Sequence, residues 1–367
     1  MNYLFIITSL SQGGAEKKLL NIIRYIRKDK SSQSMLVVLK SNGKMEDEFN
    51  KEQIKIINLN LSNLFFFFSF NFFKNIISIY RFSPDYVVSW LYHSNIISIF
   101  IKFITFKSNF LIWNIRQTLN KKYFKSYNKK LIIYLQFLFS FIPDLIIFNS
   151  DQSKTTHLKY LFKNNINKFK VIPNSFNSDE FYKISKDKIT SLRKKYDIND
   201  KNIIISNFSR YHTMKNHELF IKISLDLLSI DSSYKIIMAG DGVLIKYKNL
   251  IDKNFIIFDN LKNINEFLNI SDCVFLTSSY GESFPSILAE TMLTETLPIS
   301  TNVGNSKKLI SDYGLIINSQ YSAEQIDKFI KKNYKNINLL KNARKKIINN
   351  YSIERICNYY INTIKQI

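Results

Sequence analysis

Short runs rich in apolar residues recur along the chain, each followed by a turn and then by a longer helical stretch. Residues 3–8 form the first run, and residues 84–90 and 112–116 repeat it farther on. A mostly apolar run of this length is typical of a strand that is buried on both faces of a parallel sheet. Strands that alternate with helices form βαβ units, so the sequence predicts an α/β protein.

The same alternation starts again in the second half of the chain. Residues 202–207, 234–239 and 255–258 are further expected strands, and a linker is expected near residues 176–190. A chain of 367 residues is long enough for two α/β domains of ordinary size. The expected domains are residues 1–176 and residues 177–350, followed by a last helix over residues 351–367.

Glycine is scarce, and its positions are informative for that reason. Seven of the eight glycines fall where an expected strand meets a helix or a loop. These positions are expected to need a positive φ or a close approach of the backbone. The turn at Gly13 and Gly14 lies between a strand and a helix, so its amides could meet a phosphate. The seven glycines are Gly13, Gly14, Gly240, Gly242, Gly281, Gly304 and Gly314.

The stretch over residues 280–292 is expected to turn out of a strand and open a helix. Pro285 suits the first helical turn, where a missing N–H costs nothing. The N–H groups of Ser283, Phe284 and Ser286 would then point outward at the helix N-terminus. Such a terminus is a ready site for a phosphate or sugar oxygen.

Two glutamates in this stretch, Glu282 and Glu290, are eight residues apart. In a helix this spacing brings both carboxylates to nearly one face, roughly 12 Å apart along the axis at ~1.5 Å per residue. Two acids beside an anion-binding helix start suit a nucleotide-diphosphate sugar, which has an anionic middle and hydroxyl-bearing ends. A solvated amphipathic helix is the alternative interpretation.

Cationic and imidazole side chains follow several of the expected strands. Arg210 and Lys215 come after the strand over residues 202–207. The forked guanidinium of Arg210 can donate two parallel hydrogen bonds to a diphosphate, and the Lys215 ammonium supplies a point charge. Surface ion pairing is the alternative for these two. His93 and Arg116 stand at or just beyond strand ends, where α/β sheets bind ligands.

These motifs resemble those of retaining glycosyltransferases of the GT-B fold, most closely glycosyltransferase family 4. The resemblance rests on Gly281-Glu282-x-Phe284 followed by Glu290, on Arg210-x4-Lys215, and on Gly13-Gly14-Ala15-Glu16. Several positions depart from the family pattern: Ser283 replaces a common Gly, Asn302 an Asp, and Asn305 a Gly. The resemblance covers nearly the whole chain. It implies two doubly wound Rossmann-like domains that face a cleft, with the last helix crossing back to the first domain.

The resemblance implies a reaction as well as a fold. It implies transfer of a hexose or N-acetylhexosamine, with retention, from a nucleotide-diphosphate sugar, with a UDP-sugar favoured. The implied acceptor is a growing lipid-linked surface glycan of the O-antigen or capsule kind, and no metal or other cofactor is implied. A sugar-nucleotide epimerase of the same fold and a non-catalytic sugar-nucleotide-binding protein remain as alternatives.

The resemblance also assigns roles to individual residues. Arg210 and Lys215 would neutralise the departing diphosphate. Glu290 would hold the ribose hydroxyls, and Glu282 with the Ser283 and Phe284 amides would hold the donor sugar. Gly240 and Leu261 would lie beside the nucleotide base. His93, Gly13 and Gly14 would contact the donor from the opposite domain. Arg116 would lie on the acceptor side.

The net charge of +23 favours an anionic partner. No recognised nucleic-acid-binding module is present, so we expect a phosphorylated ligand or an anionic membrane surface. Residues 64–74 form either a core helix or an aromatic-rich helix that inserts into a bilayer interface. Residues 120–141 carry five lysines ahead of an apolar helix, which indicates either a peripheral membrane site or a core helix with a solvated basic end.

The sequence also bears on where the protein acts. Residues 1–7 lack the basic start of a targeting segment, and residues 131–148 contain Gln136, Pro143 and Asp144, which is unlike a membrane span. The two cysteines are expected to be free core thiols in a reducing compartment, and the four histidines show no metal-ligand spacing. We therefore expect a cytoplasmic protein, peripheral on the inner face of the cytoplasmic membrane.

Overall fold

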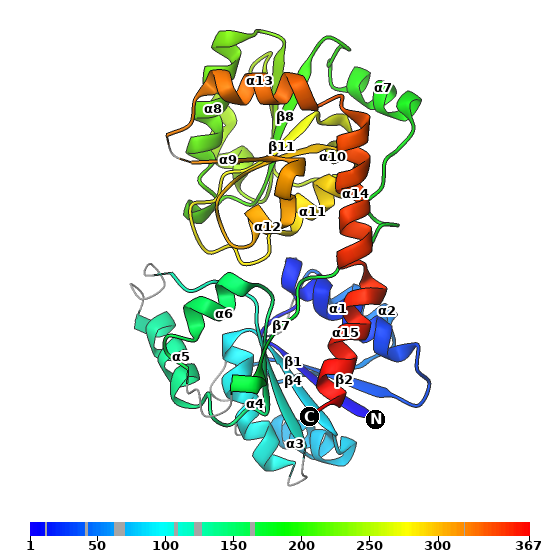
Figure 1. Cartoon of the computed structure of the whole chain (residues 1–367). Helices are drawn as coiled ribbons and strands as arrows, with labels where there is room; N and C mark the ends of the chain where they lie inside the picture. The colour runs from blue at the N-terminus through cyan, green and yellow to red at the C-terminus, as the bar shows by residue number, and fades with distance from the viewer. Residues whose placement is uncertain are drawn as a thin grey trace. The chain divides into compact units, whose positions relative to one another are not determined.

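The computed structural model describes most of the chain and divides it into two compact units (Figure 1). Unit 1 comprises Met1–Ser175 together with Ile353–Ile367, and unit 2 comprises Phe176–Ser352. The described residues are 1–11, 13–40, 43–61, 70–105, 109–120, 127–161, 166–318 and 320–367.

Unit 1 contains a parallel sheet of seven strands in the order β3-β2-β1-β4-β5-β6-β7. The central strands are buried on both faces, which is why apolar residues dominate their sequences, although buried polar residues such as Ser89 of β4 also occur. The strands are β1 (Asn2–Ile7), β2 (Gln33–Val38), β3 (Lys55–Asn58), β4 (Tyr86–Trp90), β5 (Phe110–Ile115), β6 (Leu145–Phe148) and β7 (Phe169–Val171).

Helices complete unit 1, including one from the far end of the chain. The C-terminal helix packs against the first helix, and the buried Tyr360 hydroxyl donates to Asn114 Oδ1 at 3.1 Å. The helices are α1 (Gly14–Arg27), α2 (Glu46–Lys51), α3 (Phe70–Phe82), α4 (Tyr92–Ile104), α5 (Tyr127–Leu138), α6 (Asp151–His157), the 3₁₀ helix η3 (Ile166–Lys168) and α15 (Ile353–Lys365).

Unit 2 contains a second parallel sheet, with six strands in the order β10-β9-β8-β11-β12-β13. Two apolar clusters cover its faces, and the first includes Leu288 and Met292 of the helix that follows β11. The strands are β8 (Ile203–Phe208), β9 (Tyr234–Ala239), β10 (Phe255–Phe258), β11 (Cys273–Leu276), β12 (Leu297–Thr301) and β13 (Leu315–Ile317).

The helices of unit 2 connect these strands and close the unit. The chain enters at Phe176 and leaves at Ser352, which form an isolated parallel bridge. The helices are α7 (Lys186–Lys195), η4 (Thr213–Lys215), α8 (His217–Ile230), α9 (Val243–Tyr247), η5 (Lys248–Leu250), α10 (Ile264–Ile270), α11 (Ser286–Leu293), α12 (Ser306–Ile310), η6 (Ser311–Tyr313), α13 (Ala323–Asn333) and α14 (Ile337–Tyr351).

Each sheet has one point where the order of its strands reverses direction. In unit 1 it lies between β1 and β4, and in unit 2 between β8 and β11. Loops that leave the carboxyl ends of two such strands diverge to opposite faces of the sheet, and the space between them is where open α/β sheets bind ligands. The fold therefore points to the loops after β1 and β4 and to those after β8 and β11.

The predicted α/β fold class is confirmed, because both units are built on parallel Rossmann-like sheets. One local prediction was wrong. Pro285 has an extended backbone and α11 begins at Ser286, so Pro285 precedes the helix and Glu282 lies in the loop before it. Glu282 and Glu290 therefore do not share a helix. Most of the aromatic run over residues 64–74 and the lysines at 121, 122 and 125 lie outside the described residues.

Candidate functional site

The loops that follow β8 and β11 are joined by backbone contacts at the carboxyl edge of the unit 2 sheet. The Ser279 amide donates to the Met214 carbonyl at 2.8 Å, and the Thr277 hydroxyl donates to the Lys215 carbonyl at 3.1 Å. These bonds fix η4, the short helix that carries Lys215, against the segment that leads into Glu282. The two segments therefore form one structural element at the point where the strand order reverses.

An ion pair joins the same two loops through their side chains. Lys215 Nζ lies 2.5 Å from Glu282 Oε1, and the two side chains are only 19% and 12% exposed. The Ser278 hydroxyl donates to the same carboxylate oxygen at 2.9 Å. Burial acts to raise the pKa of Glu282, but Lys215, Ser278 and the charge of Arg210 together hold that pKa below its ordinary value. Glu282 is therefore ionised at neutral pH.

Arg210 lies in the loop directly after β8, and the backbone on both sides of it is held by the loop after β9. The Ser209 amide donates to the Ala239 carbonyl at 2.9 Å, and the Tyr211 amide donates to the Asp241 carbonyl at 2.8 Å. The Arg210 side chain is exposed. A fixed backbone with a solvent-exposed guanidinium is suited to binding an anion that arrives from solution.

Gly240 allows this close approach of the two loops. Its φ is +155°, and a Cβ at this position would lie 2.1 Å from the Ser209 carbonyl oxygen and 2.7 Å from the Arg210 amide. Only glycine combines this backbone conformation with the absence of a side chain. Gly240 thus allows the close approach to the Arg210 backbone, and its predicted place beside the nucleotide base stays a prediction.

His217 is a residue of this site that sequence reasoning missed. Its Nε2 lies 3.1 Å from the Ser209 hydroxyl and 3.2 Å from the Ser209 carbonyl. The carbonyl can only accept, so Nε2 carries the proton, and burial lowers the pKa of the ring. His217 is the first residue of α8, and its position two residues after Lys215 in the same motif was the only available signal.

The residues after Glu282 are held by backbone contacts. The Ser283 carbonyl accepts a hydrogen bond from the Asn305 amide at 2.8 Å, and a Cβ on Gly304 would lie 2.5 Å from the same oxygen. The Phe284 ring packs in the core of unit 2 against Phe176 and Tyr351. The Phe284 ring is therefore not available to a ligand, and the predicted contact of its backbone amide with the donor stays a prediction.

The other predicted donor residues of unit 2 lie farther from this ion pair along the chain. Glu290 is in the second turn of α11 and is half-buried. Leu261 follows β10, is half-buried, and packs against the core cluster that contains Phe284. Their predicted roles stay predictions.

Unit 1 presents a second candidate edge, where its strand order reverses between β1 and β4. The Trp90 indole N–H donates to the Ala15 carbonyl at 3.1 Å, and the Thr8 and Ser94 hydroxyls lie 3.1 Å apart. These bonds bring the turn at Gly13 and Gly14 close to the start of α4, where His93 lies. Desolvation and the charge of Lys40 lower the pKa of His93, so its imidazole is neutral at pH 7.

The backbone at the end of β4 is strained. Leu91 has φ +75° and ψ 164°, a conformation that is rare for residues other than glycine. This turn directs the chain from β4 into α4 and places His93 in the first helical turn. No sequence signal indicated a positive φ at a leucine, and such strain is concentrated at functional sites.

Arg116 lies at the end of β5 in a largely desolvated position. Its guanidinium stacks 3.9 Å above the Trp90 ring and donates to Asn174 Oδ1 and Asn114 Oδ1, both at 3.2 Å. Burial lowers its pKa to about 10, so it remains a cation at neutral pH. Among the described residues it has no carboxylate partner, and its buried Nε has no hydrogen-bond partner. Its acceptor-side role stays a prediction.

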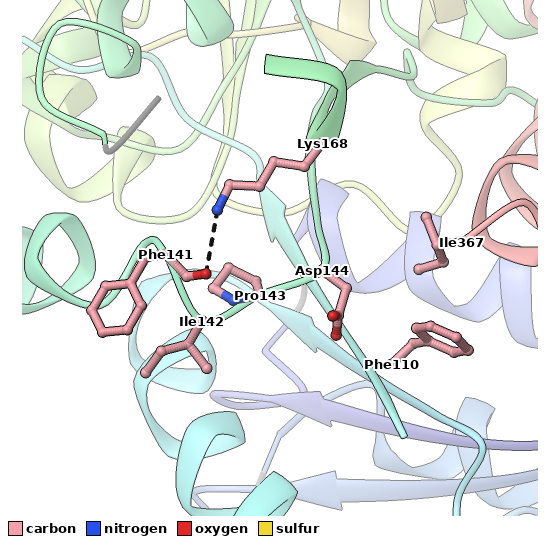
Figure 2. Close-up of a pocket in the computed structure, with 7 residues that line it drawn as sticks. All are labelled: Phe110, Phe141, Ile142, Pro143, Asp144, Lys168 and Ile367. Atoms are coloured by element: carbon pink, nitrogen blue, oxygen red, sulfur yellow. Dashed lines mark hydrogen bonds between the residues drawn. The ribbon is translucent and has the colours of Figure 1, made fainter. Parts of the chain in front are cut away.

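A cavity of about 400 Å³ opens at the other edge of the unit 1 sheet (Figure 2). Phe110 begins β5, Asp144 precedes β6 and Lys168 precedes β7, so the cavity lies at the amino ends of the strands. The Lys168 ammonium donates to the carbonyls of Ser140 and Phe141, the second at 3.5 Å. This cavity lies at the edge of the sheet opposite Gly13, Gly14 and His93, and it is not part of the candidate site.

Within the described residues, no three His, Cys, Asp or Glu side chains gather as they would around a metal ion. None of the described helices is long and apolar enough to cross a membrane. Both cysteines, Cys273 and Cys357, are buried and free.

The chain is similar to a protein family, to one further protein by sequence, and to several solved structures. Residues 188–350 match the family model of glycosyl transferases group 1. An uncharacterized glycosyltransferase of Methanocaldococcus jannaschii, MJ1059, is 27% identical over 275 residues, which span 70% of this chain and 66% of that protein.

Among solved structures, the fold is similar to Anabaena HepE in complex with UDP-glucose, with a TM-score of 0.80, 19% identity and full coverage of both chains. It is also similar to WaaG, a glycosyltransferase involved in lipopolysaccharide biosynthesis, with a TM-score of 0.72, 13% identity, and coverage of 97% and 99% of the two chains.

Proposed function

We propose that this chain, which has the GT-B fold, is a group 1 glycosyltransferase and that it transfers a hexose or N-acetylhexosamine from a UDP-sugar with retention. The proposed acceptor is a growing lipid-linked surface glycan, such as an O-antigen or capsule precursor. HepE, whose fold is similar, has been crystallised with UDP and with UDP-glucose. This supports uracil as the base of the proposed nucleotide-sugar donor.

One observation supports the proposed donor site most strongly. Arg210, Lys215 and Glu282 come from two loops that bonds hold together at the carboxyl edge of the unit 2 sheet. Two cations and one carboxylate at such an edge match a donor with a diphosphate and a hydroxyl-bearing sugar. Because these bonds fix the two loops to each other, the proposed charges are held in position for the donor.

In the proposed reaction the bond between the anomeric carbon and the β-phosphate oxygen breaks, and its electron pair stays on the diphosphate. Arg210 and Lys215 stabilise that developing charge, as preorganised cations do in other phosphate sites. The acceptor hydroxyl forms the new bond on the same face of the sugar and gives its proton to the departing phosphate. No protein group is proposed as the general base.

Glu282 has two functions in this proposal, one for each carboxylate oxygen. Oε1 accepts from Lys215 and Ser278, which orients both the carboxylate and the ammonium. Among the described residues, both of these hydrogen bonds end on Oε1, so Oε2 is left to accept a hydroxyl of the donor sugar. Glu282 is therefore proposed to bind the sugar directly and to position Lys215.

The other predicted residues keep their roles as part of this proposal. Glu290 would hold the ribose hydroxyls, and the Ser283 and Phe284 amides would contact the sugar. Gly240 and Leu261 would border the base, and Gly13, Gly14 and His93 would contribute to the donor site from unit 1. Arg116 would act on the acceptor side. Group 1 enzymes of this fold are typically metal-independent, and we propose the same here.

A transfer assay tests the proposal. Purified protein is incubated with radiolabelled UDP-hexoses and UDP-N-acetylhexosamines, a lipid-linked oligosaccharide extract and EDTA. The expected result is UDP release together with movement of label into the lipid fraction, and NMR of the product shows the donor's anomeric configuration. Release of a free sugar-nucleotide epimer, inversion, or nucleotide binding without turnover would contradict it.

The proposed acceptor also determines the proposed location. A lipid-linked glycan is accessible only at a membrane surface, so we propose that the protein works at the inner face of the cytoplasmic membrane. The positive net charge supports attraction to an anionic leaflet.

A further inference from the structure

Helices α4 and α5 of unit 1 pack side by side and both expose large apolar side chains. On α4, Phe100 and Phe103 are 61% and 63% exposed. On α5 and just beyond it, Leu131, Tyr134, Leu138 and Phe141 are 41–61% exposed. Spacings of three and four residues place each set on one face of its helix. We name these six residues the α4–α5 face.

The exposure is not a consequence of helices that failed to pack. The opposite sides of the same helices are buried, through Ile99 and Ile101 on α4 and Ile133 on α5. A helix that covers a sheet in a water-soluble domain normally has a polar outer face. Here apolar residues occupy the outer face as well, and contiguous exposed apolar surface marks an interaction site.

The charges of this region indicate which partner fits. Residues 53–144 contain eleven Lys or Arg residues and two acidic residues, Asp85 and Asp144, and Asp144 pairs with Lys102 of α4 at 2.8 Å. Neither α4 nor α5 contains a carboxylate, whereas each contains lysine. Lys130, on the first turns of α5, is exposed. Aromatic and aliphatic side chains beside an excess of cations match the interface of an anionic lipid bilayer.

A second copy of the chain fits this face poorly. In a two-fold dimer the same patch meets itself, so the excess positive charge of this region in one copy would oppose that of the other. Anionic lipid headgroups supply the missing negative charge. Charge complementarity therefore favours a membrane over self-association.

We propose that the α4–α5 face docks unit 1 on an anionic membrane, with the apolar side chains in the headgroup and acyl boundary. The inference rests on the proposed lipid-linked acceptor. His93 lies in the first turn of α4, and Phe100 and Phe103 lie seven and ten residues farther on, which is roughly 10 to 15 Å along the helix axis. The same helix thus connects the membrane contact to the candidate edge of unit 1.

Vesicle flotation of the full chain tests this inference. Wild type is compared with Phe100→Ser/Phe103→Ser and with Leu131→Ser/Tyr134→Ser. The matched control is Leu225→Ser/Ile245→Ser, because these two residues are also exposed but lie on α8 and α9 of unit 2. Vesicles contain phosphatidylglycerol with phosphatidylcholine, or phosphatidylcholine alone, at low salt.

The expected result is that wild type and the control float with anionic vesicles only, and that each α4–α5 variant binds at least tenfold less. Wild type that does not float, or variants that float equally well, would overturn the inference. A wild-type dimer that dissociates in the variants, measured by light scattering, would assign the face to a second copy and overturn it too. A UDP-induced rise in melting temperature is measured in parallel, so that failure of the docking surface and failure of the donor site are distinguished.

Discussion

Lys215 Nζ and Glu282 Oε1 are 2.5 Å apart, although the two residues are 67 positions apart in the chain. The pair joins the loops after β8 and β11, and the Ser278 hydroxyl completes it. A partly buried ion pair of this kind contributes little net stability, because desolvation of both charges offsets their attraction. We therefore attribute its value to the fixed orientation that it gives to a cation and a carboxylate at the proposed donor site.

Lys215→Ala separates the catalytic effect of this pair from its structural effect. Loss of the cation is expected to lower turnover by at least ~10²-fold. It also leaves the Glu282 carboxylate largely buried and unpaired, which is expected to cost roughly 2–4 kcal/mol in the free energy of unfolding. The double variant Lys215→Ala/Glu282→Gln removes the unpaired charge, so stability should return while turnover stays low. Recovery of turnover in the double variant would contradict the assigned role.

Arg210→Ala is expected to lower turnover by at least ~10²-fold without changing stability, because the side chain is exposed. Lys201→Ala is the matched control, since Lys201 is an exposed cation outside the site. Steady-state kinetics and thermal melting of the three proteins provide the measurement. Near-normal turnover in Arg210→Ala would remove Arg210 from the mechanism.

Gly240→Ala tests whether the Arg210 loop depends on the close approach of the loop after β9. A methyl group here would clash with the Ser209 carbonyl, so we expect lower stability and at least tenfold weaker UDP binding, because the loop that carries Arg210 must move. Gly242→Ala is the control. Gly242 also has a positive φ, of +77°, but a Cβ there meets only the Tyr211 Cβ, at 3.4 Å. We expect that variant to lose only ~1–2 kcal/mol of stability and to bind UDP normally.

His157 should make unit 1 sensitive to acid. Burial lowers its pKa to about 4, and its ring bonds to the Tyr92 hydroxyl and the Ser153 carbonyl as a neutral imidazole. The unfolded chain binds this proton near pH 6.5, so the free energy of unfolding should fall as the pH drops below that value, by about 2 kcal/mol at pH 5.

Fluorescence can follow this effect in unit 1, because both tryptophans, Trp90 and Trp113, are buried there. Denaturant titrations of wild type and His157→Gln at pH 7.5 and 5 give the difference between the two proteins. The variant should lack the part of the pH dependence that His157 causes. An equal loss of stability in both proteins would exclude His157 as its source.

Much of the fold could be predicted, because parallel strands that are buried on both faces have mostly apolar sequences. The runs at residues 3–8 and 202–207 differ from the observed strands β1 and β8 by one residue at each end. The start of α11 could not be predicted, because Pro285 is compatible with either the first helical turn or the residue before it. Only the tertiary contacts of the preceding loop select the second.

The candidate site was predictable in its residue types but not in its pairings. The Arg210 and Lys215 motif indicated cations at a strand end, and Glu282 was expected to contact a ligand. Its bond to Lys215 joins two loops that are distant in the sequence, and no local pattern reports it. The strain at Leu91 was equally hidden, because a leucine gives no signal for a positive φ.

In the proposed donor site, unit 2 binds a uridine diphosphate sugar through the loops after β8 and β11 and through Glu290. The most direct measurement is a thermal-shift panel of UDP, GDP, ADP and their common sugars on wild type and on Glu290→Ala. A ligand that binds only the folded protein raises its melting temperature. We predict a clear rise with UDP and one of its sugars in wild type, and no rise in the variant. The absence of a shift with every nucleotide would contradict the donor site.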